Sequence, residues 1–289
     1  MDETVRNNRT LARSIYVNDS TKAELSNKIA GIFENLAKDT ISGKLKSKNG
    51  TLNEKAGSFE FKRFANATVQ EYGTARGAGA GNKVKALPII INLTRNKEIV
   101  EEVNTFDAAS FTDEDLNAFL ARRKTAIQQS VARDLDRDFF DAAKSGGTAK
   151  AALDDTKDLV PQLEAIIAGL EVTSNDYVDG VDREQMALVL NPTIYGKVKT
   201  ELNDCYNFAG TVADEVFKGI NGVATFSSNR LPSGVAYVLM VMDSIAQPVM
   251  ITDVDIEKIP LSNEYAVEVF YRNKSKVLAS ELVLYGNEA

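Results

Sequence analysis

The chain has 289 residues and a mass of 31.5 kDa, enough for one large domain or two of ordinary size. It contains no histidine and one cysteine, Cys205, which excludes Ser-His-Asp and Cys-His catalysis, imidazole-ligated metals and an intrachain disulfide. The first residues lack the apolar segment of a signal peptide, and the longest apolar run, 235–242, is too short to span a bilayer. We therefore expect a protein made and kept in a cytosol, without membrane contact.

Charge is distributed unevenly along the chain. The net charge is −7, but residues 1–97 carry +8 and the remaining residues −15. Three interpretations stay open: a nucleic-acid-binding arm, a basic segment that lies on the acidic surface of another copy, and a merely solvated surface. Opposite charges on two surfaces of one chain favour head-to-tail self-association, and an acidic body disfavours tight, general DNA binding.

The N-terminal part predicts an arm followed by a helix. Residues 1–19 are polar and basic and are typical of an irregular arm. Residues 20–42 carry an apolar stripe at helical spacing, begin with the capping-box pair Thr21 and Glu24, and are expected to end at Gly43. The polar residues 44–55 are expected to form a loop.

Two strand-like runs, 58–72 and 83–93, surround a glycine-rich stretch at 73–82. This pattern predicts a long hairpin with a flexible tip. The hairpin has few large apolar residues for its length, so we expect it to project from the body. Because an isolated hairpin is only marginally stable in water, a projecting one should pack against another molecule.

A very long helix is expected next. After a short strand at 98–104, residues 112–144 keep apolar residues at three-or-four spacing and start with acidic residues that suit a helix N-terminus. Thirty-three helical residues would extend roughly 50 Å, far beyond the average helix. Such a strut implies an elongated subunit, with Gly146 and Gly147 as its stop.

The remaining chain predicts an α/β lobe and then antiparallel strands. Between 148 and 250, helices are expected at 159–171 and 193–202 and strands at 186–190, 235–242 and 249–251. The C-terminal stretch is expected to form three antiparallel strands, at 254–259, 265–272 and 277–285.

None of the candidate chemical sites has the pattern that a reaction needs. The glycines at 73–81 lack the Lys-Ser/Thr ending of a phosphate loop and the following helix of a dinucleotide site. Asp134 and Asp138 alternate with Arg133 and Arg137, as on a salt-bridged helix face, and Cys205 has no histidine to act as its base. We expect no catalytic residues, no metal and no cofactor, and hence no enzyme.

In the order of its parts, the chain resembles the major capsid proteins of tailed bacteriophages, which share the HK97-like fold. The matching parts are the N-terminal arm, the hairpin at 57–93, the helix at 112–144, the α/β lobe and the terminal strands. The resemblance implies an α+β fold in five segments. These are an N-arm with its helix (1–56), an extended E-loop (57–93), a P-domain with the spine helix (94–147), an A-domain (148–252) and P-domain return strands (253–289).

The resemblance also implies a function. Many copies would assemble as pentamers and hexamers into the icosahedral head that encloses double-stranded DNA, with weak, non-specific DNA contact. Assembly would take place in the host bacterial cytoplasm, and the partners would be a scaffolding protein, a portal and decoration proteins. A separate scaffolding protein is favoured because only about 50 residues precede the E-loop, where some relatives carry a cleaved domain of roughly one hundred.

Contacts between subunits are expected from the E-loop, whose candidate residues are Phe59, Phe61, Arg63, Arg76, Lys83 and Lys85. The aromatic group around Phe61 could also stack on bases, as in single-strand binders, but packing against a neighbour is the favoured interpretation. The isopeptide crosslink of some relatives is not expected, since no partner asparagine and catalytic glutamate can be identified.

Three alternative functions remain. The first is the shell of an encapsulin-type nanocompartment with the same fold. The second, from a different class, is a nucleic-acid-binding module that uses the basic residues 1–97, which predicts steeply salt-dependent DNA affinity. The third is a carboxylate enzyme such as a hydrolase, which predicts a small oligomer with a deep acidic pocket.

Overall fold

The computed structural model describes residues 40–53, 57–67, 85–103, 113–154, 156–206, 219–258 and 265–288. The chain divides into two compact units. Unit 1 comprises Met1–Lys44, Leu93–Asp136 and Pro248–Lys274, and unit 2 comprises Leu45–Asn92, Arg137–Gln247 and Ser275–Ala289. The expected arm at 1–19, most of the expected helix at 20–42 and the glycine-rich tip lie outside the described residues.

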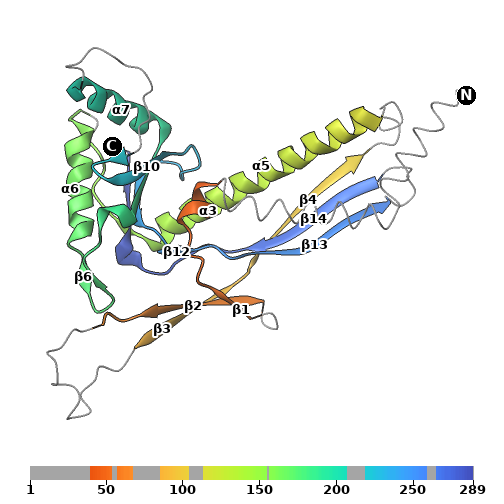
Figure 1. The fold of residues 1–289 in the computed structure, drawn as a ribbon, viewed down its shortest axis with the longest axis horizontal. Coiled ribbons are helices and arrows are strands. Elements are labelled where there is room, and N and C mark those ends of the chain that lie inside the picture. The colour runs from red at the N-terminus through yellow and green to blue at the C-terminus, as the bar shows by residue number, and fades with distance from the viewer. Residues whose placement is uncertain are drawn as a thin grey trace, which may run out of the picture. The chain divides into compact units, whose positions relative to one another are not determined.

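Unit 1 contains a three-stranded antiparallel sheet in the order β13-β14-β4 (Figure 1). The strands are β4 (Arg95–Val103), β13 (Val249–Lys258) and β14 (Tyr265–Asn273). Val269 and Tyr271 alternate with more exposed neighbours and are fully or almost fully buried, as expected when one face of a sheet is covered. The expectation of separate strands at 249–251 and 254–259 is wrong, because β13 continues through a register shift between Ile251 and Asp253.

The long helix is confirmed as α5 (Asp113–Gly146), with 34 residues. Within unit 1, Ile127, Val131 and Leu135 form its buried stripe. Asp134 pairs with cations of β4: its carboxylate lies 3.5 Å from an Arg95 nitrogen and 3.3 Å from Lys97 Nζ. The Tyr271 hydroxyl donates a 3.0 Å hydrogen bond to the same carboxylate. These contacts connect the helix to the strands, whereas the sequence had suggested pairs along the helix itself.

Near residue 40, the structure corrects the expected helix end. Gly43 does not terminate a helix but lies inside α3 (Ile41–Leu45). The Thr40 hydroxyl accepts a 2.9 Å hydrogen bond from the Gly43 amide, and Asp136 accepts one of 3.0 Å from the Ser42 amide. The side chains thereby satisfy amides at the start of the helix, which is the role of an N-cap. The expected loop at 44–55 also contains a strand, β1 (Thr51–Asn53).

Unit 2 is built on a six-stranded mixed sheet in the order β5-β16-β11-β8-β10-β9. Central β8 (Met186–Leu190) is parallel to β10 (Val223–Ser227) and antiparallel to β11 (Val235–Val241). Every residue of β8 is buried, as in a strand covered on both faces. The outer strands are β5 (Thr148–Ala149), β16 (Val283–Asn287) and β9 (Gly219–Ile220).

Two helices, α6 (Leu159–Glu171) and α7 (Pro192–Tyr206), lie near this sheet in Figure 1. Leu163, Ile167 and Leu170 of α6 belong to one apolar cluster. The same cluster contains Met186, Leu188 and Leu190 of β8 and Val198 of α7. Asn191 caps α7, since its side-chain oxygen accepts hydrogen bonds from the amides of Thr193 and Ile194. The predicted α/β lobe is therefore present, with α6 and β8 at their expected bounds.

The expected strand at 277–285 is wrong in detail. It divides into β15 (Lys276–Val277), the 3-10 turn η2 (Ser280–Leu282) and β16. β15 pairs with β12 (Ile245–Ala246), whereas β16 pairs with β11 in the six-stranded sheet. The apolar alternation of residues 277–285 did not indicate this division, because a period of two does not specify which partner strand each half will pair with.

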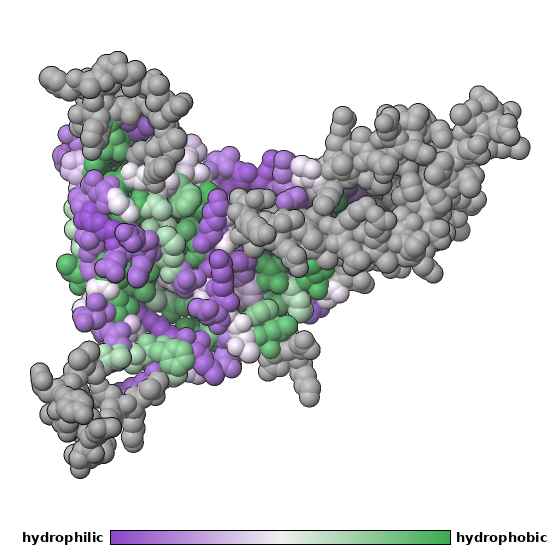
Figure 2. Space-filling view, in the orientation of Figure 1, coloured by the Kyte–Doolittle hydropathy of each residue, from purple (hydrophilic) through white to green (hydrophobic). Residues whose placement is uncertain are grey.

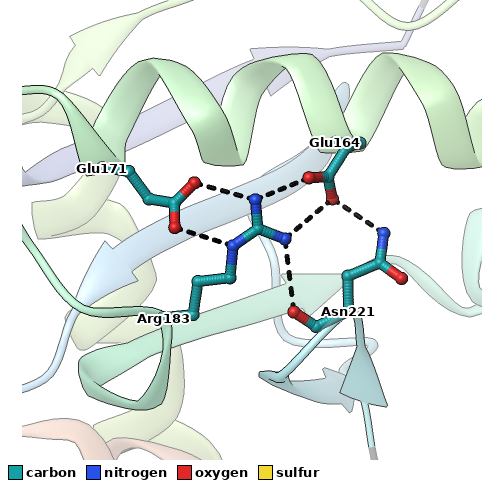
Figure 3. A network of polar contacts seen from close by, with 4 residues as sticks. All are labelled: Glu164, Glu171, Arg183 and Asn221. Carbon is teal, nitrogen blue, oxygen red and sulfur yellow. Dashed lines mark hydrogen bonds and ion pairs between the residues drawn. The ribbon is translucent and has the colours of Figure 1, made fainter.

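An arginine joins three elements of unit 2 (Figure 3). Arg183 lies in the 3-10 turn η1 (Arg183–Gln185) and contacts two carboxylates of α6: its Nη2 is 2.6 Å from Glu164, and its Nε is 2.7 Å from Glu171. Glu164 also accepts a 2.8 Å hydrogen bond from Asn221, in the turn between β9 and β10. Asn221 and Gly222 both have positive φ, as a tight two-residue turn between antiparallel strands requires. Charge-assisted hydrogen bonds hold this turn against α6.

The Arg183 network predicts a change in the pH dependence of stability. Hydrogen bonds from Arg183 lower the pKa of both Glu164 and Glu171 from the ordinary value of 4.5. Their stabilisation is therefore present at neutral pH and is lost as pH falls below that value. We expect Arg183→Gln to flatten the acid limb of the unfolding free energy between about pH 5 and pH 3. Urea denaturation at stepped pH measures this, and acid limbs of equal slope in both proteins would contradict it.

A second prediction concerns a close approach in the sheet. Gly286 of β16 lies opposite Tyr237 of β11, and a Cβ on Gly286 would come within 2.1 Å of the fully buried tyrosine ring. We expect Gly286→Ala to destabilise the protein by about 1–3 kcal/mol. The matched control is Gly169→Ala in α6, where a Cβ meets nothing within 4 Å and should stabilise by about 0.5–1 kcal/mol. Equal urea midpoints for the two variants would refute the packing argument.

Candidate functional site

The expected hairpin is formed by β2 (Ser58–Phe64) and β3 (Ala86–Asn92), which pair antiparallel with Phe61 opposite Ile89. β1 adds a third strand on the other side of β2. The body of the expected hairpin is thus present, and the segment beyond it, 68–84, lies outside the described residues. Because successive residues of a strand point to opposite faces, the hairpin has an inner and an outer face.

The inner face packs on the rest of unit 2, within the same chain. Phe61 and Ile91 are 4% and 2% exposed and form a small apolar cluster with Ala246 of β12. Phe59, Ile89 and Leu278 pack around it as half-buried neighbours. Gly50 faces the Phe61 ring so closely that a Cβ there would lie 2.5 Å from it. We call this cluster of Phe59, Phe61, Ile89, Ile91, Ala246 and Leu278 the seat of the hairpin.

The outer face leaves apolar side chains in solvent. It carries Glu60, Lys62 and Phe64 on β2, opposite Ile90, Pro88 and Ala86 on β3. Phe64 is 56% exposed and Ile90 59% exposed. Figure 2 shows apolar side chains at the surface over this hairpin. Phe64 and Ile90 lie at opposite ends of this face, with the Lys62–Pro88 pair between them. A face that exposes large apolar side chains among charged ones is typical of a surface that binds another molecule.

Polar contacts hold the hairpin further along β2. Arg63, whose side chain is 19% exposed, forms an ion pair with Glu281 of η2, and its guanidinium carbon lies 4.7 Å from the centre of the Tyr177 ring. Three residues later the chain is attached again, because the Asn66 backbone amide donates a 2.9 Å hydrogen bond to the Asp176 carbonyl oxygen. On β3, Lys276 Nζ lies 3.5 Å from the Ile90 carbonyl oxygen.

Electrostatics at this ion pair favour the charged state. Burial by itself would raise the pKa of Glu281, but hydrogen bonds from Arg63, from its own backbone and from Asn175 outweigh burial and lower it below 4.5. The carboxylate is therefore ionised at neutral pH and can serve as a permanent partner of Arg63.

A cavity of about 210 Å³ lies between the hairpin and the body of unit 2. The hairpin contributes Phe61, Lys62, Arg63 and Ile89 to its lining, and the body contributes Ser47, Asn49, Met242, Asp243, Ser244, Leu278, Ala279 and Leu282. The Ser244 hydroxyl is buried there without a hydrogen-bond partner. The hairpin is thus not packed against the body along its whole length.

The structure separates the six predicted contact residues. Phe61 and Arg63 contact the chain's own unit 2, Phe59 is half-buried at the seat, and Lys85 is exposed just before β3. Arg76 and Lys83 lie outside the described residues. Contact with a second subunit remains a prediction for all six. Sequence reasoning did not select Ile90, Glu281 or Tyr177; alternation along 86–92 could have indicated Ile90, but no local signal marks the other two.

Other site types have little support in the part of the chain that the structure describes. No group of three potential metal-ligating residues is found among the described residues. Among the helices that the structure describes, none combines the length and apolar character needed to cross a membrane. The candidate site is therefore the hairpin, which has one buried face and one face with exposed apolar side chains.

Comparison with known proteins agrees with this architecture. The model of the family described as "Phage capsid protein" matches residues 97–269, more than half of the chain. No curated protein sequence matches the chain significantly.

Three solved structures represent the likeness in fold. The capsid of the cyanophage P-SCSP1u has 15% identity and a TM-score of 0.61, and the match covers 86% of this chain and 88% of that one. The capsid of Ralstonia phage GP4 has 13% identity and a TM-score of 0.56, with 84% and 86% covered. The virus-like particle from Pyrococcus furiosus has 12% identity and a TM-score of 0.55, with 91% and 100% covered.

At these identities the structural likeness establishes the fold, while the family model establishes the relationship. The encapsulin-type alternative is the less supported one, because the matching family is that of phage capsid proteins. The α+β architecture, with its long helix, hairpin and mixed-sheet lobe, agrees with both comparisons. The chain belongs to the phage capsid protein family and has the HK97-like fold of the major capsid proteins of tailed bacteriophages.

Proposed function

We propose that this protein is the major capsid protein of a tailed double-stranded DNA bacteriophage and that its copies form the icosahedral head. The observation that carries the proposal is the phage capsid family match across residues 97–269. Its role is structural: the protein performs its function by occupying a lattice position in the virion shell.

The hairpin gives this function a physical basis. Its inner face is seated on its own subunit, and its outer face exposes Phe64 and Ile90. Burying such residues against a second copy would remove apolar surface from water at every repeat of the lattice. We propose that the outer face, together with Lys85 and the segment beyond it, lies on a neighbouring subunit.

The remaining roles follow the expected segments. We propose that 1–56 forms the N-arm, 57–93 the E-loop, 94–147 and 253–289 the P-domain, and 148–252 the A-domain. Pentamers and hexamers would assemble in the host bacterial cytoplasm with a scaffolding protein and a portal, and decoration proteins would bind outside. The residues after 97 carry a net charge of −15, which disfavours tight binding to the phosphates of DNA. This charge supports weak, non-specific contact with packaged DNA.

The first test is assembly itself. We expect the purified chain, alone or with its scaffolding protein, to form closed particles, tubes or capsomer-sized rings, because lattice proteins associate by repeated equivalent contacts. Negative-stain microscopy and sedimentation velocity measure this. A stable monomer or dimer under every condition would refute the proposed function and return nucleic-acid binding and carboxylate chemistry to consideration.

The second test concerns the outer face. We expect Ile90→Asp to reduce particle yield at least tenfold, because a carboxylate would be buried without a partner at each contact. The matched control is Val172→Asp at the end of α6, where an apolar side chain is 77% exposed but lies outside the hairpin. We expect this variant to assemble normally, and circular dichroism should show both variants folded. Normal particle yield from folded Ile90→Asp would exclude the outer face as a subunit contact.

A further inference from the structure

We infer that Arg63, Glu281 and Tyr177 form an intrachain clamp that fixes the direction of the hairpin relative to the lobe of unit 2. Arg63 is then a positioning residue, which acts within its own subunit rather than across the contact. The inference rests on the proposed function only for its consequence, namely that a fixed hairpin presents its outer face to a second copy.

Apolar packing alone does not determine this direction. The seat contains three buried residues, Phe61, Ile91 and Ala246, close to the base of the hairpin. Beside it lies the cavity of about 210 Å³, lined by both the hairpin and the body. Apolar contacts are non-directional, so a small seat next to a cavity leaves the hairpin able to pivot about Phe61.

The clamp supplies a second, directional point of attachment. Arg63 lies two residues beyond Phe61 on the same face of β2, and its guanidinium is held between a carboxylate and an aromatic ring. A planar guanidinium that bonds in its plane and stacks on its face has a defined orientation, unlike the ammonium of lysine. Two fixed points along one strand define the direction of the hairpin.

The partners of Arg63 are themselves held in place. Glu281 also accepts a 2.9 Å hydrogen bond from Asn175 Nδ2. Tyr177 lies in the turn between β6 (Ser174–Asn175) and β7 (Val178–Asp179). Its backbone amide donates a 2.8 Å hydrogen bond to the side-chain oxygen of Asn175. The Asn66 side chain donates a 3.2 Å hydrogen bond to the Asn175 carbonyl oxygen. The small β6–β7 hairpin of the lobe therefore contacts both Arg63 and the segment that follows β2.

The clamp can be tested by distances between two nitroxide labels. In a Cys205→Ser background, labels at Lys85→Cys in the hairpin and Val172→Cys in the lobe both occupy exposed positions within unit 2. The labelled full-length chain is diluted tenfold into unlabelled protein, so that pulsed electron resonance reports distances within one subunit whether or not it assembles. We expect one narrow distribution for the parent chain.

Removing either side of the clamp should broaden this distribution. We expect at least a twofold increase in width for Arg63→Gln and for Tyr177→Leu. Tyr177→Phe, which keeps the ring, should retain the parent width, as should the matched control Arg137→Gln, an exposed arginine of α5. If Tyr177 only stabilised the lobe, Tyr177→Phe and Tyr177→Leu variants with equal melting temperatures would have distance distributions of equal width.

The outcomes separate this inference from the proposed function. Unchanged widths in both Arg63→Gln and Tyr177→Leu overturn the clamp, even if the protein forms shells. Broadening in Arg137→Gln to the same extent also overturns it, since the effect would then not be specific to the clamp. A chain that forms no shells but shows the expected widths supports the clamp and refutes the proposed function.

Discussion

A two-stranded hairpin cannot bury both of its faces with its own residues, and this constraint organises the functional part of the molecule. The strands β2 and β3 alternate their side chains, so one face can be seated on the lobe only if the other faces away from it. The seat buries Phe61 and Ile91, while Phe64 and Ile90 remain in solvent. A protein that forms a lattice can bury such exposed apolar side chains between its copies.

Polar contacts complete what this small seat leaves open. The lobe of unit 2 has a large apolar core around β8, and there packing alone can specify one arrangement. At the hairpin the buried cluster is small and a cavity lies beside it, so orientation depends on Arg63 and its partners. The Arg183 network acts similarly at the β9–β10 turn, where a single guanidinium joins η1, α6 and Asn221 (Figure 3). In both places an arginine supplies direction that methyl groups cannot.

Half-buried carboxylates in the described part of the chain have a similar structural role. Three of them show this: Asp134 holds β4 to α5, Glu281 holds the hairpin, and Glu164 holds a turn. Capsid assembly requires many weak, repeated contacts rather than one activated group. The function therefore resides in which surfaces remain uncovered after folding.

The sequence by itself determined the elements with strong local signals. The period of α5, the continuous apolar run of β8 and the alternation of the hairpin each fix a structure from neighbouring residues, and their order along the chain already indicated the capsid fold. Only the tertiary structure decided the partners. It placed β16 beside β11 rather than beside β14, turned Phe61 inward and engaged Arg63 with Glu281, 218 residues away. Pairings over such separations depend on which surfaces meet after folding, and no local pattern of residue types encodes that choice.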